Sequence, residues 1–437
     1  MAPKMRLENR VTRRVTPALI AMLKARMADI LPFQPYRYTA LAGALQDLAT
    51  QPYDKISPEM RQRYLKASPY NLVRIILGER RPSDAAGDSV YTRAAAHLKD
   101  WIARGILARE AEPALFAYFQ EFTMPDSGAR LVRKGFIGLG AVEEYAAGVV
   151  HRHEQTLSGP KQDRLELLRH THAHFGQIFM LYPDPSGEID RLLDETAQAA
   201  PLGVVTDEYG ACHSLWKIAD AARVARIRHL MADKKLLIAD GHHRYETALA
   251  FRRENPALRG ADRVMMTFVN MHSPGLKILA THRLVSGVAG FDAGEFIRQA
   301  AAGFEVAQIP GVEVLERAWT ESPGRTIIGA AMAGRLYMIE ARDRESQLDV
   351  KVLHERLLRL LGIGEEAVRE ERNLRYVRGL EAALEAARGG AAQVAFLLKP
   401  VAVEEVARIS FGGGVMPQKS TDFYPKLLSG LTIYRLE

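Results

Sequence analysis

The chain has 437 residues and a mass of 48.6 kDa, and its 47% hydrophobic and 25% charged residues are typical of a globular protein. This composition excludes a disordered chain, a fibrous repeat and a small disulfide-stapled domain, and the single cysteine excludes a cysteine-rich metal site. No stretch has the roughly 18 consecutive apolar residues of a membrane helix, and no signal peptide is evident. We therefore expect a cytoplasmic protein with no membrane partner.

The net charge of +7 is concentrated at the N-terminus. Residues 1–30 hold seven basic and two acidic side chains, so the rest of the chain is nearly neutral. We interpret this segment as a basic, solvated N-terminal extension. Contact with nucleic acid or anionic lipid is the alternative interpretation.

Turn signals and hydrophobic periodicity predict an α+β fold of alternating strands and helices. In the first part of the chain, Ser57 and Pro58 are typical of a helix start, and residues 90–104 form a predicted amphipathic helix. A strand is predicted at 72–77, and a hairpin joins predicted strands at 114–123 and 130–139. Further helices are predicted at 162–169, 245–253, 348–361, 376–388 and 402–409, and further strands at 236–239, 263–270, 277–280, 325–330, 335–341 and 393–398.

Changes in this pattern predict domain borders near residues 145 and 285. The predicted parts are the extension at 1–30, an N-terminal α/β region at 31–145, a phosphate-binding core at 146–285, and a C-terminal α/β region with a substrate-binding loop at 286–437.

The most informative segment follows the predicted strand 236–239 and reads Asp240-Gly241-His242-His243-Arg244. Where a strand runs into a helix through a glycine turn, backbone N–H groups and the helix dipole point at one place, which suits an anion. The arginine can bind two phosphate oxygens, the histidines add donors, and the carboxylate of Asp240 can hold Mg²⁺. A capped helix start with buried histidines is the alternative interpretation.

Two further segments carry polar side chains that suit the same chemistry. In the first, Glu154 stands in a polar turn where a carboxylate can act as a general base, and Thr156, Ser158 and Lys161 can bind a polar substrate. In the second, the neighbouring residues Lys419, Ser420 and Thr421 can bind an anion. Taken alone, each segment also fits an ordinary capping loop.

Five histidines gather between His151 and His174. The spacing of His170, His172 and His174 would place three imidazoles on one face of an extended strand, where they could bind a transition metal. A polar strand edge is the alternative interpretation, which we favour because no HExxH or CxxC spacing accompanies the cluster.

The chain resembles the DUF1015 family of bacterial and archaeal proteins, and the resemblance extends from about residue 30 to the end. The matching stretches are Gln51–Ser57, Ser68–Asn71, His153–Lys161, Ile238–Ala248, Thr281–Leu284, Met416–Thr421 and Phe423–Lys426.

Three of these stretches also resemble the archaeal free serine kinases, which have a ParB/sulfiredoxin-like fold. The matching positions are His153-Glu154-Gln155, Asp240 to Arg244, and Pro417 with Lys419-Ser420-Thr421. The resemblance implies that Glu154 is the catalytic base, that Asp240 and the His242-His243-Arg244 turn serve the phosphate donor, and that Lys419, Ser420 and Thr421 hold the substrate. The chain departs from these kinases in a longer stretch between Glu154 and Asp240 and in an N-terminal region without a counterpart.

The hypothesis is therefore a kinase that phosphorylates the hydroxyl of free L-serine, with Glu154, Asp240 and His243 as catalytic residues. Gly241, His242, His243 and Arg244 would bind the donor phosphates, and Mg²⁺ would bind at Asp240. ATP, ADP and pyrophosphate remain alternative donors. Two other function classes remain open: a ParB-like nucleotide-binding module associated with DNA, and a metal-dependent phosphohydrolase.

Overall fold

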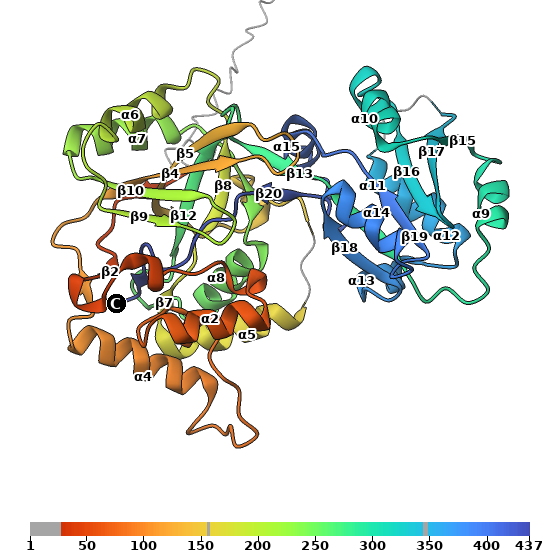
Figure 1. Ribbon diagram of the computed structural model, residues 1–437. Coiled ribbons are helices and arrows are strands. Elements are labelled where there is room, and N and C mark those ends of the chain that lie inside the picture. The colour runs from red at the N-terminus through yellow and green to blue at the C-terminus, as the bar shows by residue number, and fades with distance from the viewer. Residues whose placement is uncertain (1–27, 155–157, 344–347) are drawn as a thin grey trace, which may run out of the picture.

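The computed structural model describes residues 28–154, 158–343 and 348–437, so nearly all of the predicted N-terminal extension lies outside the described residues. The described chain mixes helices with several sheets, which confirms the predicted α+β class. It forms a large lobe and a small lobe (Figure 1). The ParB/sulfiredoxin-like assignment stays a prediction.

The large lobe is built on a sheet in which nine described strands take part. Its strands, in spatial order, are β6 (Val150–His151), β11 (Leu236–Asp240), β8 (Ile178–Tyr182), β12 (Arg263–Asn270), β5 (Arg130–Ala141), β4 (Leu115–Thr123), β10 (Cys212–Ile218) and β9 (Gly203–Thr206), and β1 (Ile30–Leu31) pairs with β5. The predicted hairpin is confirmed as β4 and β5, which pair from Phe116↔Ile137 to Thr123↔Arg130. The predicted border near residue 145 falls inside this sheet, and the domain borders stay predictions.

Two layers cover this sheet. Apolar side chains of α6 (Glu188–Thr196), α7 (Ala221–Met231) and α8 (His242–Glu254) pack on one face. On the other face lie side chains of α15 (Val403–Phe411) and of residues 416–431, which return from the small lobe. The remaining elements of the large lobe are α2 (Pro58–Ala67), α3 (Val73–Ile76), α4 (Val90–Ala103), α5 (Ser158–Thr171), β2 (Tyr36–Tyr38), β3 (Leu107–Arg109), β7 (Ala173–His174) and β21 (Tyr434–Arg435), with short 3₁₀ turns at Ala40–Ala42, Leu45–Asp47, Tyr53–Lys55 and Tyr145–Ala147.

The small lobe is a six-stranded sheet flanked by helices. Its strand order is β15 (Phe304–Ile309), β17 (Arg335–Ala341), β16 (Ile327–Met332), β19 (Val394–Leu397), β14 (Thr281–Val285) and β18 (Leu374–Arg378). Its helices are α9 (Ala293–Ala300), α10 (Val312–Glu321), α11 (Asp349–Val352), a π-helical turn at Leu353–Leu357, α12 (Leu358–Leu360), α13 (Glu365–Arg369) and α14 (Leu380–Arg388). Between the lobes, β13 (Lys277–Leu279) pairs with β20 (Asp422–Tyr424).

Two element predictions are wrong, each for a local reason. Residues 72–77 form helix α3 instead of a strand, because Asn71 Oδ1 accepts a 2.9 Å hydrogen bond from the N–H of Val73 and starts a helical turn. A short apolar run without alternation is compatible with either structure. The predicted helix 376–388 begins later, since β18 runs to Arg378 and Gly379, at φ 80°, separates it from α14.

The predicted strand through the histidine cluster is also wrong. His170 lies in α5, His172 has a φ of 47°, and His174 lies in β7. The left-handed residue turns the chain, so the three imidazoles do not share one face of a strand. Within the described residues, no group of three or more His, Cys, Asp or Glu side chains is placed to hold a metal ion.

Candidate functional site

The turn after β11 has the predicted geometry of an anion site. Buried apolar residues carry the strand to Asp240, and Gly241 follows with a φ of 93° as the residue that precedes α8. A glycine is suited to this left-handed conformation because it has no Cβ. The N-terminus of α8 therefore opens beside the carboxylate of Asp240.

The carboxylate of Asp240 lies among cations. Its Oδ2 accepts a 3.0 Å hydrogen bond from Arg244, and its Oδ1 lies 3.8 Å from the ammonium of Lys426. Burial alone would raise the pKa of Asp240, but Lys426, Arg244 and Lys55 outweigh it and hold the pKa well below its usual range. Asp240 is therefore an ionised anchor for cationic side chains.

The second and third predicted segments meet at a buried histidine. His153 donates from Nδ1 to the carbonyl of Ile238 at 2.8 Å, so its Nε2 accepts a 2.7 Å hydrogen bond from the hydroxyl of Thr421. Burial lowers the pKa of His153, which keeps the ring neutral. The backbone of Met416 donates to the carbonyl of His153 at 2.7 Å, and Glu154 forms a bridge with Met416. These contacts hold the C-terminal loop against Glu154.

The C-terminal loop presents its polar residues in different directions. Lys419 has a φ of 56°, and a buried arginine of β14, Arg283, donates to its carbonyl at 3.0 Å. Lys419 and Thr421 line the same cavity as Glu154. The hydroxyl of Ser420 donates to the carbonyl of Pro417, and this residue lines a different cavity.

A cavity of about 520 Å³ collects most of the predicted site. The predicted residues that line it are Glu154, Asp240, Gly241, His242, His243, Arg244, Lys419 and Thr421. They come from parts of the chain more than 80 residues apart, and the fold brings them to one cavity. Their chemical roles stay predictions.

Other predicted residues lie elsewhere. Lys161 does not line this cavity and instead forms a 3.1 Å ion pair with Glu246 of α8. Thr156 and the side chain of Ser158 lie outside the described residues. Arg244 lines the cavity, but its guanidinium donates to the carbonyl of Gln177 and to Asp240, so it is engaged by the protein itself.

The two histidines of the turn differ in burial. His242 is 7% exposed, its ring centroid lies 4.6 Å from that of His153, and its buried Nε2 has no hydrogen-bond partner among the described residues. Burial, together with His153, lowers the pKa of His242 well below its usual value. Burial also lowers the pKa of the less buried His243. Both rings are therefore neutral near pH 7.

Sequence analysis gave no role to several charged residues of this cavity. Lys55 lines it from the 3₁₀ turn at Tyr53–Lys55, and burial followed by the charge of Lys426 lowers its pKa. Lys426 is itself buried and lies 3.1 Å from Asp422, which also pairs with Arg378. The signal for these residues was present, because both Lys55 and Lys426 stand in stretches that match the DUF1015 pattern.

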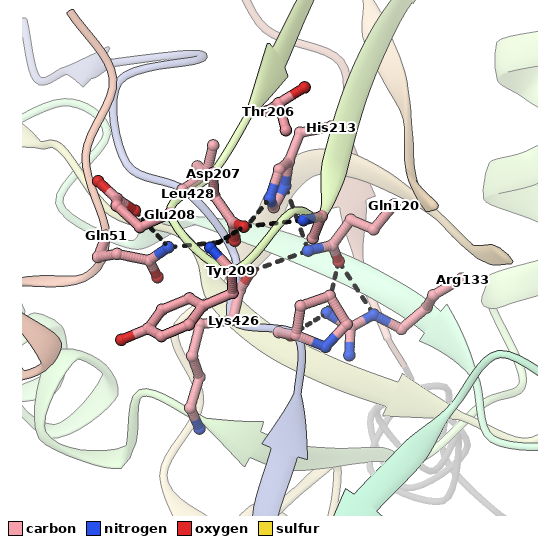
Figure 2. A network of polar contacts seen from close by, with 12 residues as sticks. Gln51, Gln120, Arg133, Thr206, Asp207, Glu208, Tyr209, His213, Lys426 and Leu428 are labelled. Atoms are coloured by element: carbon pink, nitrogen blue, oxygen red, sulfur yellow. Dashed lines mark hydrogen bonds and ion pairs between the residues drawn. The ribbon is translucent and has the colours of Figure 1, made fainter. Parts of the chain in front are cut away.

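A buried polar network holds the backbone around Lys426 (Figure 2). Gln120 donates to the carbonyl of Lys426 at 2.8 Å, and Arg133 donates to the carbonyls of Tyr424 and Pro425. Tyr118 accepts from the N–H of Leu428 at 3.2 Å. Hydrogen bonds with side chains of β4 and β5 therefore hold the backbone segment that carries the Lys426 ammonium.

The same network reaches the segment that carries Lys55 (Figure 2). His213 donates from Nε2 to Asp207 at 3.2 Å and accepts at Nδ1 from the Tyr118 hydroxyl at 2.6 Å. Asp207 also accepts from the side chain of Gln51 at 3.1 Å. One set of buried groups therefore contacts both the backbone around Lys426 and Gln51, which precedes the turn that carries Lys55.

The cation-rich surroundings of Asp240 do not fit the predicted magnesium site. Both of its oxygens face positive groups of the protein, Arg244 and Lys426, whereas a bound Mg²⁺ needs free carboxylate oxygens. The surroundings of Asp240 therefore do not favour a metal ion. Within the described ranges, no helix is both long and apolar enough to cross a membrane.

Comparison with known proteins finds distant structural similarities. No curated protein matches the chain. A free serine kinase in complex with AMP is 16% identical, with a TM-score of 0.38, over 66% of this chain and 88% of that one. A conserved hypothetical protein from Pyrococcus furiosus is 17% identical, with a TM-score of 0.34, over 63% of this chain and 87% of that one. A C-terminally truncated SbnI from Staphylococcus aureus is 10% identical, with a TM-score of 0.34, over 67% of this chain and 85% of that one.

The comparison with protein families is more direct. The family described as "Protein of unknown function (DUF1015)" matches residues 30–358, which is well over half of the chain. The match includes the β11–α8 turn and the whole large-lobe sheet. The chain belongs to the DUF1015 family.

Proposed function

We propose that the protein is a phosphotransferase that moves a phosphoryl group from ATP, ADP or pyrophosphate to the hydroxyl of free L-serine. One observation carries the proposal: a carboxylate, a helix N-terminus and several lysines, contributed by distant segments, line one cavity of about 520 Å³. Phosphoryl transfer requires mainly positioning and charge neutralisation, which these groups supply. The choice of serine follows the resemblance of three motifs to the free serine kinases.

The donor phosphates would lie at the N-terminus of α8. The helix amides after Gly241 provide donors, and Lys55 and Lys419 line the cavity with ammonium groups that form no ion pair with the described residues. Arg244 and Lys426 act differently, because Asp240 already binds both. These two cations would raise the positive potential of the cavity while they stay paired with Asp240.

Glu154 would be the general base. Its side chain is 21% exposed and lines the cavity, and the hydrogen bond between His153 and Thr421 fixes the loop beside it. The serine oxygen would attack the terminal phosphorus and form a new P–O bond, while Glu154 takes the hydroxyl proton. The bridging P–O bond would break, and its electrons would leave with ADP, AMP or phosphate.

The test incubates the full-length protein and L-serine with magnesium and each of the three donors. Phosphorus NMR and mass spectrometry then detect O-phosphoserine. We expect product with one donor and a loss of about 10²- to 10⁴-fold in rate for Glu154→Gln. Glu144→Gln is the matched control, since that exposed carboxylate pairs with Arg253 away from the cavity. A fully active Glu154→Gln protein would remove the base assignment.

The same assay addresses the phosphohydrolase alternative, and a separate DNA-binding measurement addresses the ParB-like one. Free phosphate without phosphoserine would support a phosphohydrolase. DNA binding that falls steeply with salt would support the ParB-like module, because counterion release makes such binding salt-dependent.

A further inference from the structure

A second, larger cavity of about 1200 Å³ lies beside the first one, between the two lobes. Its walls come from the end of β13, the start of β14, helix α10, the start of α11 and the loops after β18 and β19. Thr281 and Arg378 line both cavities. This volume exceeds that of a typical small-molecule pocket, and the position between two lobes is a common one for such sites.

Much of the wall is apolar. The apolar side chains that line it include Leu279, Val312, Trp319, Leu380, Leu398 and Val401. The indole N–H of Trp319 donates to the carbonyl of Ile327 at 2.8 Å, which fixes the orientation of the ring. The cavity therefore offers an apolar surface with one aromatic ring already positioned.

One buried carboxylate in this wall lacks a hydrogen bond. Asp349, at the start of α11, is 7% exposed, and its Oδ2 has no hydrogen-bond partner among the described residues. The ammonium of Lys399 lies 3.7 Å away and donates instead to the carbonyls of Pro323 and Arg325, at 3.0 and 2.6 Å. A buried acceptor left unpaired is costly, so a donor from a ligand would be favourable here.

The arginines around the cavity contact other groups of the protein, whereas two of its carboxylates form no ion pair with a described residue. Arg283 donates to backbone carbonyls, and Arg325 and Arg378 are held in ion pairs. Asp126 and Glu316 also line the cavity, and neither forms an ion pair with a described residue. The cavity thus presents two carboxylates, Asp126 and Glu316, that form no ion pair with a described residue, and the Oδ2 of Asp349 without a hydrogen bond. Its cations contact carbonyls or carboxylates of the protein, although the Nε atoms of Arg283 and Arg325 have no hydrogen-bond partner among the described residues.

We propose that this cavity is a second binding site, for a small molecule that carries a protonated amine on an apolar body. The amine would donate to Asp349 Oδ2, and the apolar body would lie against Trp319 and the aliphatic side chains around it. Phosphates and carboxylates do not suit this lining, because each of its cations already has a protein partner. The proposal does not depend on the proposed kinase activity.

The test uses three probes with the same indole ring: tryptamine, which is cationic, tryptophol, which is neutral, and indole-3-propionate, which is anionic. Their binding to the full-length protein is measured by calorimetry without any phosphate donor. We expect tryptamine to bind about tenfold or more tightly than tryptophol, because a charge-assisted hydrogen bond is the stronger one. Indole-3-propionate should bind most weakly of the three.

Variants connect the binding to this cavity. Asp349→Asn should weaken tryptamine about tenfold and leave tryptophol unchanged, which also shows that the cavity remains folded. Val312→Trp, which places a bulky ring in the cavity on the same face of α10 as Trp319, should weaken binding of both. Asp343→Asn is the matched control, since this exposed acid pairs with Arg356 in the same lobe. Equal affinity for tryptamine and tryptophol, or no effect of Asp349→Asn, would overturn the amine assignment. Absence of saturable tryptamine binding at millimolar concentration would overturn the site.

Discussion

Replacing Lys426 by methionine tests the electrostatics of the cavity that Glu154 and Asp240 line. This lysine is 8% exposed and lies 3.1 Å from Asp422 and 3.8 Å from Asp240. Methionine has a similar length and no charge, so Lys426→Met leaves the buried carboxylate of Asp422 and the partly exposed carboxylate of Asp240 with one cation fewer. Because the charge is removed without opening a large cavity, any loss of stability reports on the ion pairs.

The magnitude follows from what remains around the two carboxylates. Breaking a buried ion pair costs about 3–5 kcal/mol when the other partner is left alone. Here Arg244 still binds Asp240 and Arg378 still binds Asp422, so neither carboxylate is left alone. We therefore expect a loss of about 2–3 kcal/mol in the free energy of unfolding at pH 7.

The pH dependence of this loss has a definite sign. Nearby cations, which outweigh the effect of burial, lower the pKa of both Asp240 and Asp422 in the folded protein. The stability that these groups contribute is present above their unfolded pKa, near 4, and disappears as the pH falls through the folded value. The difference between the wild type and Lys426→Met should therefore stay nearly constant from pH 7 down to about pH 4 and shrink only below about pH 4.

Urea denaturation followed by circular dichroism measures this difference at pH 7, at about pH 4 and at about pH 3. The matched control is Lys419→Met, because Lys419 lines the same cavity without an ion pair to a described residue. This control should change the stability by less than about 0.5 kcal/mol. If Lys426→Met costs no more than Lys419→Met, or if its cost does not change with pH, the electrostatic reasoning is refuted.

Three further predictions concern other positions. Gly241→Ala should destabilise the protein by about 1–2 kcal/mol in thermal unfolding, because alanine is strained at a φ of 93°. Thr421→Val should cost about 1–3 kcal/mol in urea, since it leaves the buried Nε2 of His153 unpaired, whereas Thr421→Ser should cost much less. Burial, opposed by the charge of Lys399, raises the pKa of Asp349 to about 7, so Asp349→Asn should gain up to about 4 kcal/mol relative to the wild type between pH 4 and pH 8. An unchanged difference across that range would contradict the last prediction.

The part of the site predicted from the sequence is the part that local rules specify. A buried strand, a glycine and a helix start stand next to one another in residues 236–254, so the anion-binding turn needs no information from elsewhere. The hairpin of β4 and β5 is local in the same sense. The strand predicted at 72–77 is wrong because its apolar residues fit a strand or a helix equally well. The hydrogen bond from the N–H of Val73 to Asn71 Oδ1 favours the helical turn.

The partners of each side chain depend on tertiary structure and could not be predicted. The sequence predicts that the guanidinium of Arg244 is free to bind phosphate. In the fold, this guanidinium donates a hydrogen bond to the carbonyl of Gln177. Ser420 and Thr421 are neighbours with similar hydroxyls, yet Ser420 lines the larger cavity and Thr421 lines the smaller one. Lys55 lines the smaller cavity together with Lys426, which is more than 300 residues away in the sequence, so its place in the site could not be predicted from its own segment.

Both cavities depend on the same junction between the lobes. Arg283 of β14, in the small lobe, donates to the carbonyl of Lys419, which lines the smaller cavity, while Arg283 itself lines the larger cavity. The strand pair β13–β20 joins the chain entering the small lobe to the chain leaving it. A displacement of β14 would therefore move atoms of both cavities at once. For this reason an occupant of the larger cavity and a donor in the smaller one would act on a shared set of contacts, although each site recognises its ligand through different residues.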